Sequence, residues 1–149
     1  MTNPETPPVP EPDQDPAPQG TEWPKITAAA LSEVYLRVDP EGLRRCISMC
    51  EAHADAMFEM ADRAGRELWI ETLGIGEHEL ESARLLTQKF NDKAVGGGKI
   101  AFESSAVGLL QSHANYALDM KATFEAVLRR YEEQEGIAAS SLGRIGDNL

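Results

Sequence analysis

The chain lacks the features that define several large classes of protein. Only two of its 149 residues are cysteines, which is too few for a disulfide framework. No run approaches the roughly 18 apolar residues that a membrane-spanning helix needs, so we expect no membrane insertion. The start of the chain has neither a basic stretch nor an apolar one, so we expect no Sec signal peptide.

Positive charge is also scarce. There are 25 Asp and Glu residues against 14 Lys and Arg, and the formal net charge is −11. Nucleic-acid-binding proteins need a basic face to displace counterions from phosphate, and polybasic membrane-surface proteins need similar charge. The composition therefore argues against both classes and leaves a small acidic protein whose length suits one domain.

Proline is almost confined to the beginning of the chain. Eight of the nine prolines lie within residues 1–24, together with five acidic residues and no Lys or Arg. Such a segment cannot bury enough apolar surface to offset the entropy lost on ordering it. We predict a disordered, acidic, Pro-rich leader over residues 1–24. Within it, Pro7-Pro8-Val9-Pro10 is either a ligand for a proline-reading domain or, as the composition favours, part of a solubilising tail.

Helical signals begin after the leader. Ile26–Leu31 is apolar and rich in alanine, which predicts a short helix. Asp39-Pro40-Glu41 combines an N-cap acid, a proline at the first helical position and an acid in the first turn. From there apolar and small residues recur in alternating steps of four and three, which is the spacing of a helix–helix seam. The seam residues of this first long helix are Leu43, Ile47, Cys50, Ala54, Met57, Ala61, Ala64 and Leu68.

A second long helix has a seam with the same steps. We expect it to begin at Ser104 or Ser105 and to end at Gly136. Its seam residues are Ala106, Leu110, His113, Ala117, Met120, Phe124, Val127 and Tyr131.

The segment between the two long helices contains a turn and a shorter helix. Trp69, Gly74 and Gly76 belong to the turn. Glu77–Lys93 reads as an amphipathic helix that Gly96-Gly97-Gly98 follows and ends. The apolar positions of this shorter helix are Leu80, Ala83, Leu86, Phe90 and Ala94.

These elements predict an all-α fold. The two long helices would form an antiparallel helical hairpin, with the shorter helix inserted between them, over residues 25–136. A flexible tail over residues 137–149 would follow. A lone hairpin buries only one stripe per helix, so the inserted helix or a second chain has to cover the rest.

Possible metal and catalytic residues are few. Cys46, Cys50 and His53 fall near one face of the first long helix, but no fourth zinc ligand is evident, and Cys50 suits the seam as a small hydrophobe. Neither His78 nor His113 has a nucleophile or oxyanion donor that can be assigned beside it. We therefore expect no metal, no cofactor and no enzymatic activity.

The stretch around Tyr131 points to a different kind of function. Three carboxylates follow this tyrosine before Gly136, in the expected last turn, where acids oppose the helix dipole. A local rule broken without compensation indicates function. Tyr131 and Glu135 are four residues apart, so they face the same way. The structural alternative is that Tyr131 ends the seam and the acids increase solubility.

Three segments resemble one known family. Val38-Asp39-Pro40-Glu41-Gly42-Leu43 resembles a Val-Asp-Pro-Glu-x-Leu opening, and the segment from His113 to Glu133 resembles a closing second helix. Tyr131-x-x-x-Glu135 matches a Tyr-x-x-x-Asp/Glu export signal at the end of that helix. Over Val38–Gly136 the chain thus resembles the small helical-hairpin substrates of actinobacterial type VII (ESX) secretion.

The resemblance implies a non-enzymatic protein that is secreted without a Sec signal peptide, or is cytoplasmic before export. Its Tyr131–Glu135 signal would be read by the secretion machinery, and it would form a homo- or heterodimer with a related hairpin. A second match, Tyr35-x-x-x-Asp39, precedes the first long helix and is expected to be a decoy. The alternative is a cytoplasmic chaperone or adaptor for a larger secreted partner, in which Tyr131 only packs.

Overall fold

The computed structural model describes residues 21–33 and 37–146, without the side chains of Ile137 and of residues 139–146. Its elements are α1 (Trp23–Ser32), α2 (Pro40–Glu67), α3 (Glu81–Val95), the short 3₁₀ helix η1 (Phe102–Ser104) and α4 (Ala106–Gly146). Among the described residues there is no β-strand, only an isolated bridge between Gly97 and Ile100. The all-α prediction is confirmed. Most of the predicted leader and the decoy Tyr35 lie outside the described residues.

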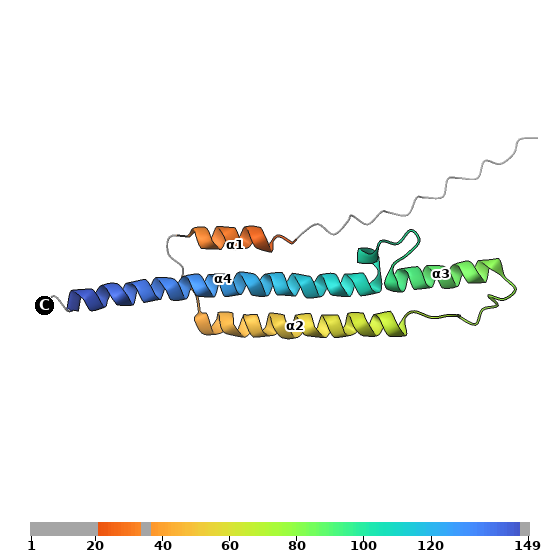
Figure 1. Cartoon of the computed structure of the whole chain (residues 1–149), viewed down its shortest axis with the longest axis horizontal. Coiled ribbons are helices and arrows are strands. Elements are labelled where there is room, and N and C mark those ends of the chain that lie inside the picture. Colours follow the sequence, from red (N-terminus) through yellow and green to blue (C-terminus); the bar gives the residue numbers. More distant parts are fainter. Residues whose placement is uncertain (1–20, 34–36, 147–149) are drawn as a thin grey trace, which may run out of the picture.

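The long helix α4 is the axis of the molecule. It contacts α1, α2, α3 and η1. Helix α2 lies along one side of α4 and runs in the opposite direction, while α1 lies on another side and runs in the same direction as α4 (Figure 1). Helix α3 extends beyond the start of α4, nearly in line with it (Figure 1). None of the described helices combines the length and apolar content needed to cross a membrane.

The helix starts predicted from caps are found where expected. The Asp39 side chain accepts a hydrogen bond of 3.1 Å from the backbone N–H of Glu41, and Pro40 is the first residue of α2. Before α4, the Ser105 hydroxyl accepts one of 3.1 Å from the N–H of Gly108. A short polar side chain can satisfy the free N–H groups of the first turn, so these signals act locally.

The packing of α2 on α4 is made by small residues. Ala54 and Ala114 are fully buried and Ala117 is 3% exposed, with Met57 packed against these three. On α2, Cys50 before Ala54 and Ala61 after it are also buried. Alanine at such contacts lets two helix backbones approach closely, and the lack of larger side chains keeps the core narrow.

The predicted seam of α2 agrees better with the observed burial of side chains than the predicted seam of α4 does. Leu43, Ile47 and Ala64 are half-buried on α2, while Leu68 is its C-cap and is 38% exposed. On α4 the placement of His113 was wrong, because that side chain is exposed. The half-buried seam residues of α4 are Ala106, Leu110, Met120, Phe124, Val127 and Tyr131.

Helix α1 explains the difference on α4, because it covers a second face of that helix. The Trp23 ring packs edge-on against the rings of Tyr116 and Phe124, with centroid distances of 5.7 and 6.0 Å. The hydroxyls of Thr27 and Thr123 are hydrogen-bonded at 2.6 Å. A single seam does not anticipate a helix buried on two sides. The predicted leader boundary at residue 24 was also wrong, since Trp23 already belongs to α1.

The predicted start of the shorter helix at Glu77 was wrong. Helix α3 begins at Glu81 and ends at Val95, so the four residues from Glu77 to Leu80 precede it. Only Ala83, Thr87 and Ala94 of α3 are buried, whereas the expected apolar positions Leu80, Leu86 and Phe90 are exposed.

Helix α4 continues through the predicted stop at Gly136 to Gly146. A glycine inside a helix costs about 1 kcal/mol relative to alanine, which weakens a helix without ending it. The backbone of most of the predicted tail is therefore helical.

Candidate functional site

The expected signal residues lie inside α4, one turn apart. Tyr131 is half-buried and Glu135 is exposed. The ion pair between Arg44, near the start of α2, and Glu132 places this part of α4 beside the start of α2. From there α4 extends past the start of α2 (Figure 1). The two residues therefore sit at the end of the α2–α4 contact, although the helix that carries them continues to Gly146.

An arginine marks the start of the α2–α4 contact. The guanidinium of Arg44 donates to the carboxylates of Glu132 and Glu41, with both N–O distances at 2.7 Å. These hydrogen bonds, that to Glu132 first, raise the pKa of Arg44 above its ordinary value. All three side chains are about half exposed or more, and exposed ion pairs contribute little to stability. The pairing orients the first turn of α2 against the turn of α4 that carries Tyr131.

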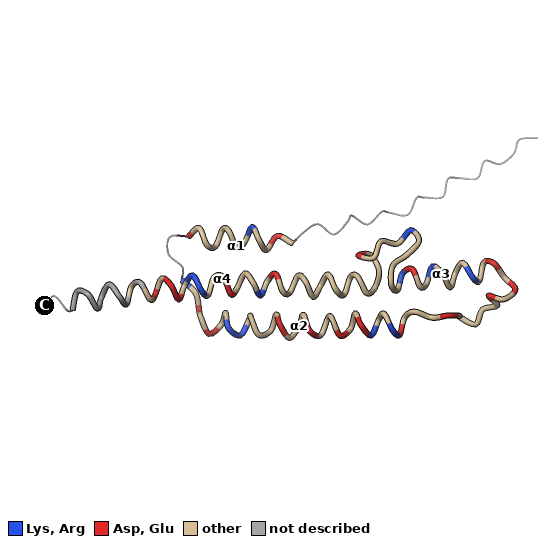
Figure 2. The backbone as a smooth tube through the Cα atoms, in the orientation of Figure 1, with Lys and Arg blue, Asp and Glu red and all other residues tan. Residues whose placement is uncertain are grey.

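The position predicted for the acids after Tyr131, in the last turn of their helix, was wrong. Figure 2 shows an acidic stretch in the second half of α4. Glu132, Glu133 and Glu135 belong to it. They are not in the last turn, because the helix continues to Gly146, so the helix dipole does not act against them there. Glu132 is paired with Arg44, and the side chains of Glu133 and Glu135 are exposed.

The predicted turn forms a long loop after α2. Trp69 is 53% exposed. Gly74 and Gly76 have φ angles of 72° and 91°, in the left-handed region that glycine adopts without strain. The Asn91 side chain of α3 holds this loop by accepting from the N–H of Ile70 at 3.0 Å and donating to its carbonyl at 2.7 Å.

Glu77 is the second residue that holds the loop. The sequence pattern did not identify this role for Asn91 or for Glu77. One oxygen of its carboxylate accepts from the N–H of Leu73 at 2.5 Å and from the hydroxyl of Thr87 at 2.9 Å. The other accepts from the N–H of Ile75 at 3.0 Å. Hydrogen bonding, first from its own backbone N–H and then from Leu73, lowers the pKa of Glu77 from 4.5 to about 2. Thr87 ties this carboxylate to α3.

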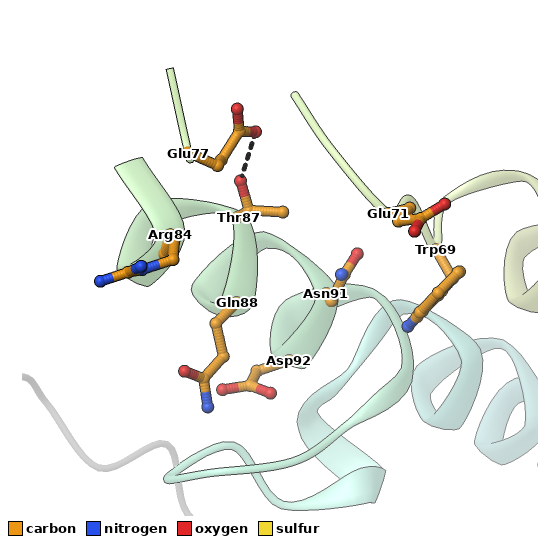
Figure 3. A pocket seen from close by; sticks show the side chains of 8 residues that line it. All are labelled: Trp69, Glu71, Glu77, Arg84, Thr87, Gln88, Asn91 and Asp92. Atoms are coloured by element: carbon orange, nitrogen blue, oxygen red, sulfur yellow. Dashed lines mark hydrogen bonds between the residues drawn. The ribbon is translucent and has the colours of Figure 1, made fainter. Parts of the chain in front are cut away.

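A polar pocket of about 400 Å³ lies between this loop and α3 (Figure 3). The side chains of Asn91, Glu77 and Thr87 face it but are already engaged in holding the loop. The pocket thus results from the loop closure, and its residues do not form a nucleophile–base pair. Its lining residues are Trp69, Glu71, Glu77, Arg84, Thr87, Gln88, Asn91 and Asp92.

The cysteines and histidines do not converge on a site. Cys46 is exposed, Cys50 is buried, and both are free thiols. Burial raises the pKa of Cys50, as does the neighbouring Cys46 to a smaller extent. Over residues 21–33 and 37–146 no three His, Cys, Asp or Glu side chains are placed to hold a metal ion. His53 and His78 are exposed.

Comparison with known proteins adds no relative. No protein-family model matches the chain, and neither a curated protein nor a solved structure matches it.

The Glu77 contacts predict an acid-dependent loop. Because the pKa of Glu77 is lowered, its stabilising effect is present above pH 4.5 and is lost as the pH falls toward about 2. Glu77→Gln should therefore be less stable than the wild type in urea at pH 7, and the difference should shrink between pH 4.5 and 2. Glu79→Gln, which removes the same charge from an exposed side chain, is the control. A difference for Glu77→Gln that is constant with pH would contradict the role of the charge.

Proposed function

We propose that this protein is a non-enzymatic helical hairpin that is exported, or is associated with export, by a type VII (ESX) secretion system. In this proposal α2 and α4 are the arms of the hairpin, and Tyr131 with Glu135 is the signal read by the secretion machinery. The protein then acts by pairing its helices with a second copy or with a related chain.

The position of the signal pair carries the proposal. Tyr131 and Glu135 are one turn apart on α4, on either side of Glu132, which pairs with Arg44 near the start of α2. Because Glu135 is exposed and Tyr131 is only half-buried, a receptor could reach both without unfolding the α2–α4 contact. The Arg44–Glu132 ion pair lies beside them and joins this stretch to the start of α2.

Exposed apolar side chains support the pairing part of the proposal. Met49 is 70% exposed, Leu109 is 51% exposed and Leu118 is 38% exposed. Scattered apolar residues are normal on a surface, but Met49 lies on α2 and Leu109 on α4, where another helix can cover them. Leu118, nine residues after Leu109, is on the opposite face of α4.

Export in a host that carries a type VII system tests the signal. Tyr131→Ala and Glu135→Gln should both remain folded, because they change a half-buried and an exposed position. Each variant should accumulate inside the cell and be lost from the culture medium, with a cytosolic protein as the lysis marker. Helical circular dichroism of the purified variants separates loss of signal from loss of fold.

Two control variants sharpen the result. Glu133→Gln removes the same charge from the same stretch but leaves the Tyr131–Glu135 spacing intact, so it should be exported normally. Tyr35→Ala, in the second match, should also be exported. If folded Tyr131→Ala and Glu135→Gln reach the medium like the wild type, the export proposal fails and the cytoplasmic chaperone or adaptor becomes the better hypothesis.

A further inference from the structure

A groove with a basic rim lies between α3 and the loop that follows it. It encloses about 440 Å³ and is here called the lysine groove. Leu85, which is 50% exposed, and the half-buried Ile100 provide its apolar surface. Its charged residues are Lys89, Asp92, Lys93 and Lys99, and all three lysines are exposed.

The charge of this region differs from that of the whole protein. The chain has a net charge of −11, yet residues 84–100 contain four Lys or Arg and a single Asp. Figure 2 shows these positive residues on α3 and on the loop above it. An apolar groove with a positive rim favours an acidic segment that also has apolar groups.

Residues 1–20 of the same chain have this composition. They contain four acidic residues, no Lys or Arg, and seven prolines. Alternating acids and prolines occur at Glu11, Asp13 and Asp15, with Pro10, Pro12 and Pro16 around them. Proline-rich chains are suited to grooves because their extended conformation is preformed and loses little entropy on binding. The groove would supply the apolar surface that this segment cannot bury by itself.

The point where this segment joins the fold places its acidic residues within reach of the lysine groove. The Thr21 hydroxyl donates to the carboxylate of Asp119 at 2.5 Å. Because α1 and α4 run in the same direction, the chain enters α1 from the end where α4 starts, and η1 and α3 lie at that end (Figure 1). From Asp119 back to Ala106 is thirteen residues, or about 20 Å along a helix.

The extended length of the segment matches this span. At roughly 3.1 Å per residue, a polyproline chain covers about 19 Å from Thr21 back to Asp15 and about 25 Å to Asp13. These carboxylates can therefore reach the level of the start of α4, where the loop with Lys99 lies.

We propose that residues 9–16 of the chain dock in the lysine groove of the same molecule. The carboxylates of Glu11, Asp13 and Asp15 pair with the lysine rim. Pro12, between Glu11 and Asp13, and the flanking Pro10 and Pro16 cover Leu85 and Ile100. The groove is thus an intramolecular site for an acidic proline-rich segment.

Nuclear magnetic resonance of the full-length protein tests this docking. The amide signals of Glu11, Asp13 and Asp15 report on the segment directly. In the variant K89E/K93E/K99E, these signals should move from their wild-type positions to those of a free chain. High salt should move the wild-type signals in the same direction, because it screens exposed charges. The three lysines are exposed, so the helical fold should be retained.

A matched variant and a charge swap complete the test. R45E/R63E/R66E makes the same change in net charge at three exposed positions of α2, and it should leave the segment's signals unchanged. Adding E11K/D13K/D15K to the groove variant reverses both partners, so the amide signals of the segment should again differ from those of a free chain and respond to high salt. Wild-type signals that already have free-chain positions and do not respond to K89E/K93E/K99E would overturn the proposal. Signals that depend on protein concentration would overturn it too, because they would show that the segment binds a second copy.

Discussion

Gly108→Ala is expected to destabilise the protein by about 3 kcal/mol, which lowers the melting temperature by about 10 °C for a chain of this size. Gly108 is in the first turn of α4, against the backbone of η1. A Cβ atom at this position would lie 2.6 Å from the carbonyl carbon of Phe102 and 2.9 Å from the Cα of Glu103. Both are backbone atoms, so no side-chain rotation can relieve the overlap, and the corner between η1 and α4 has to open.

Gly65→Ala is the matched control for Gly108→Ala. Its Cβ would meet only a methyl group of Val107 at 3.8 Å, which is an ordinary contact. Alanine is favoured over glycine inside a helix by about 1 kcal/mol, so this variant should be slightly more stable than the wild type. Thermal unfolding followed by circular dichroism compares the two. Equal shifts of melting temperature would show that the η1–α4 corner is not close-packed.

Ala54→Asp is the second substitution with a large expected effect, about 3–5 kcal/mol in the free energy of unfolding. Ala54 is fully buried against Ala114 and Ala117. An aspartate there places a carboxylate among apolar atoms without a partner and also overfills a contact made by small residues. Urea unfolding of the variant and the wild type measures the loss.

Ala52→Asp makes the same substitution on the exposed side of α2. Its effect should stay below about 1 kcal/mol, since only helix propensity changes. The pair therefore separates burial from the chemistry of aspartate. If Ala52→Asp is as damaging as Ala54→Asp, the α2–α4 contact does not have the buried face described above.

The local signals in the sequence predicted the starts of α2 and α4 correctly. Asp39 before Pro40, and Ser105 before α4, act through hydrogen bonds that span two or three residues. Such interactions depend only on neighbouring residues, so they can be read without knowing the fold. The small residues of the α2 seam were also recognised, and Ala54, Ala61 and Cys50 are buried.

The buried face of α4 could not be predicted from such local signals. The predicted seam contained His113, which is exposed, and omitted Ala114, which is fully buried. The reason is that α4 packs against α1 as well as α2. The hydrogen bond between the hydroxyls of Thr27 and Thr123 joins residues 96 apart in the chain, and no periodicity within α4 contains that information.

The acidic composition, the helical character of the chain, the cap residues and the four-residue spacing of Tyr131 and Glu135 all follow from the sequence alone. Each depends on composition or on residues within about one helical turn of each other. Only the tertiary structure decided that Trp23 packs on Tyr116, that Glu77 and Asn91 tie the loop after α2 to α3, and where the contact between α2 and α4 ends. These features join segments that are distant in the chain, so they exist only once the helices have packed.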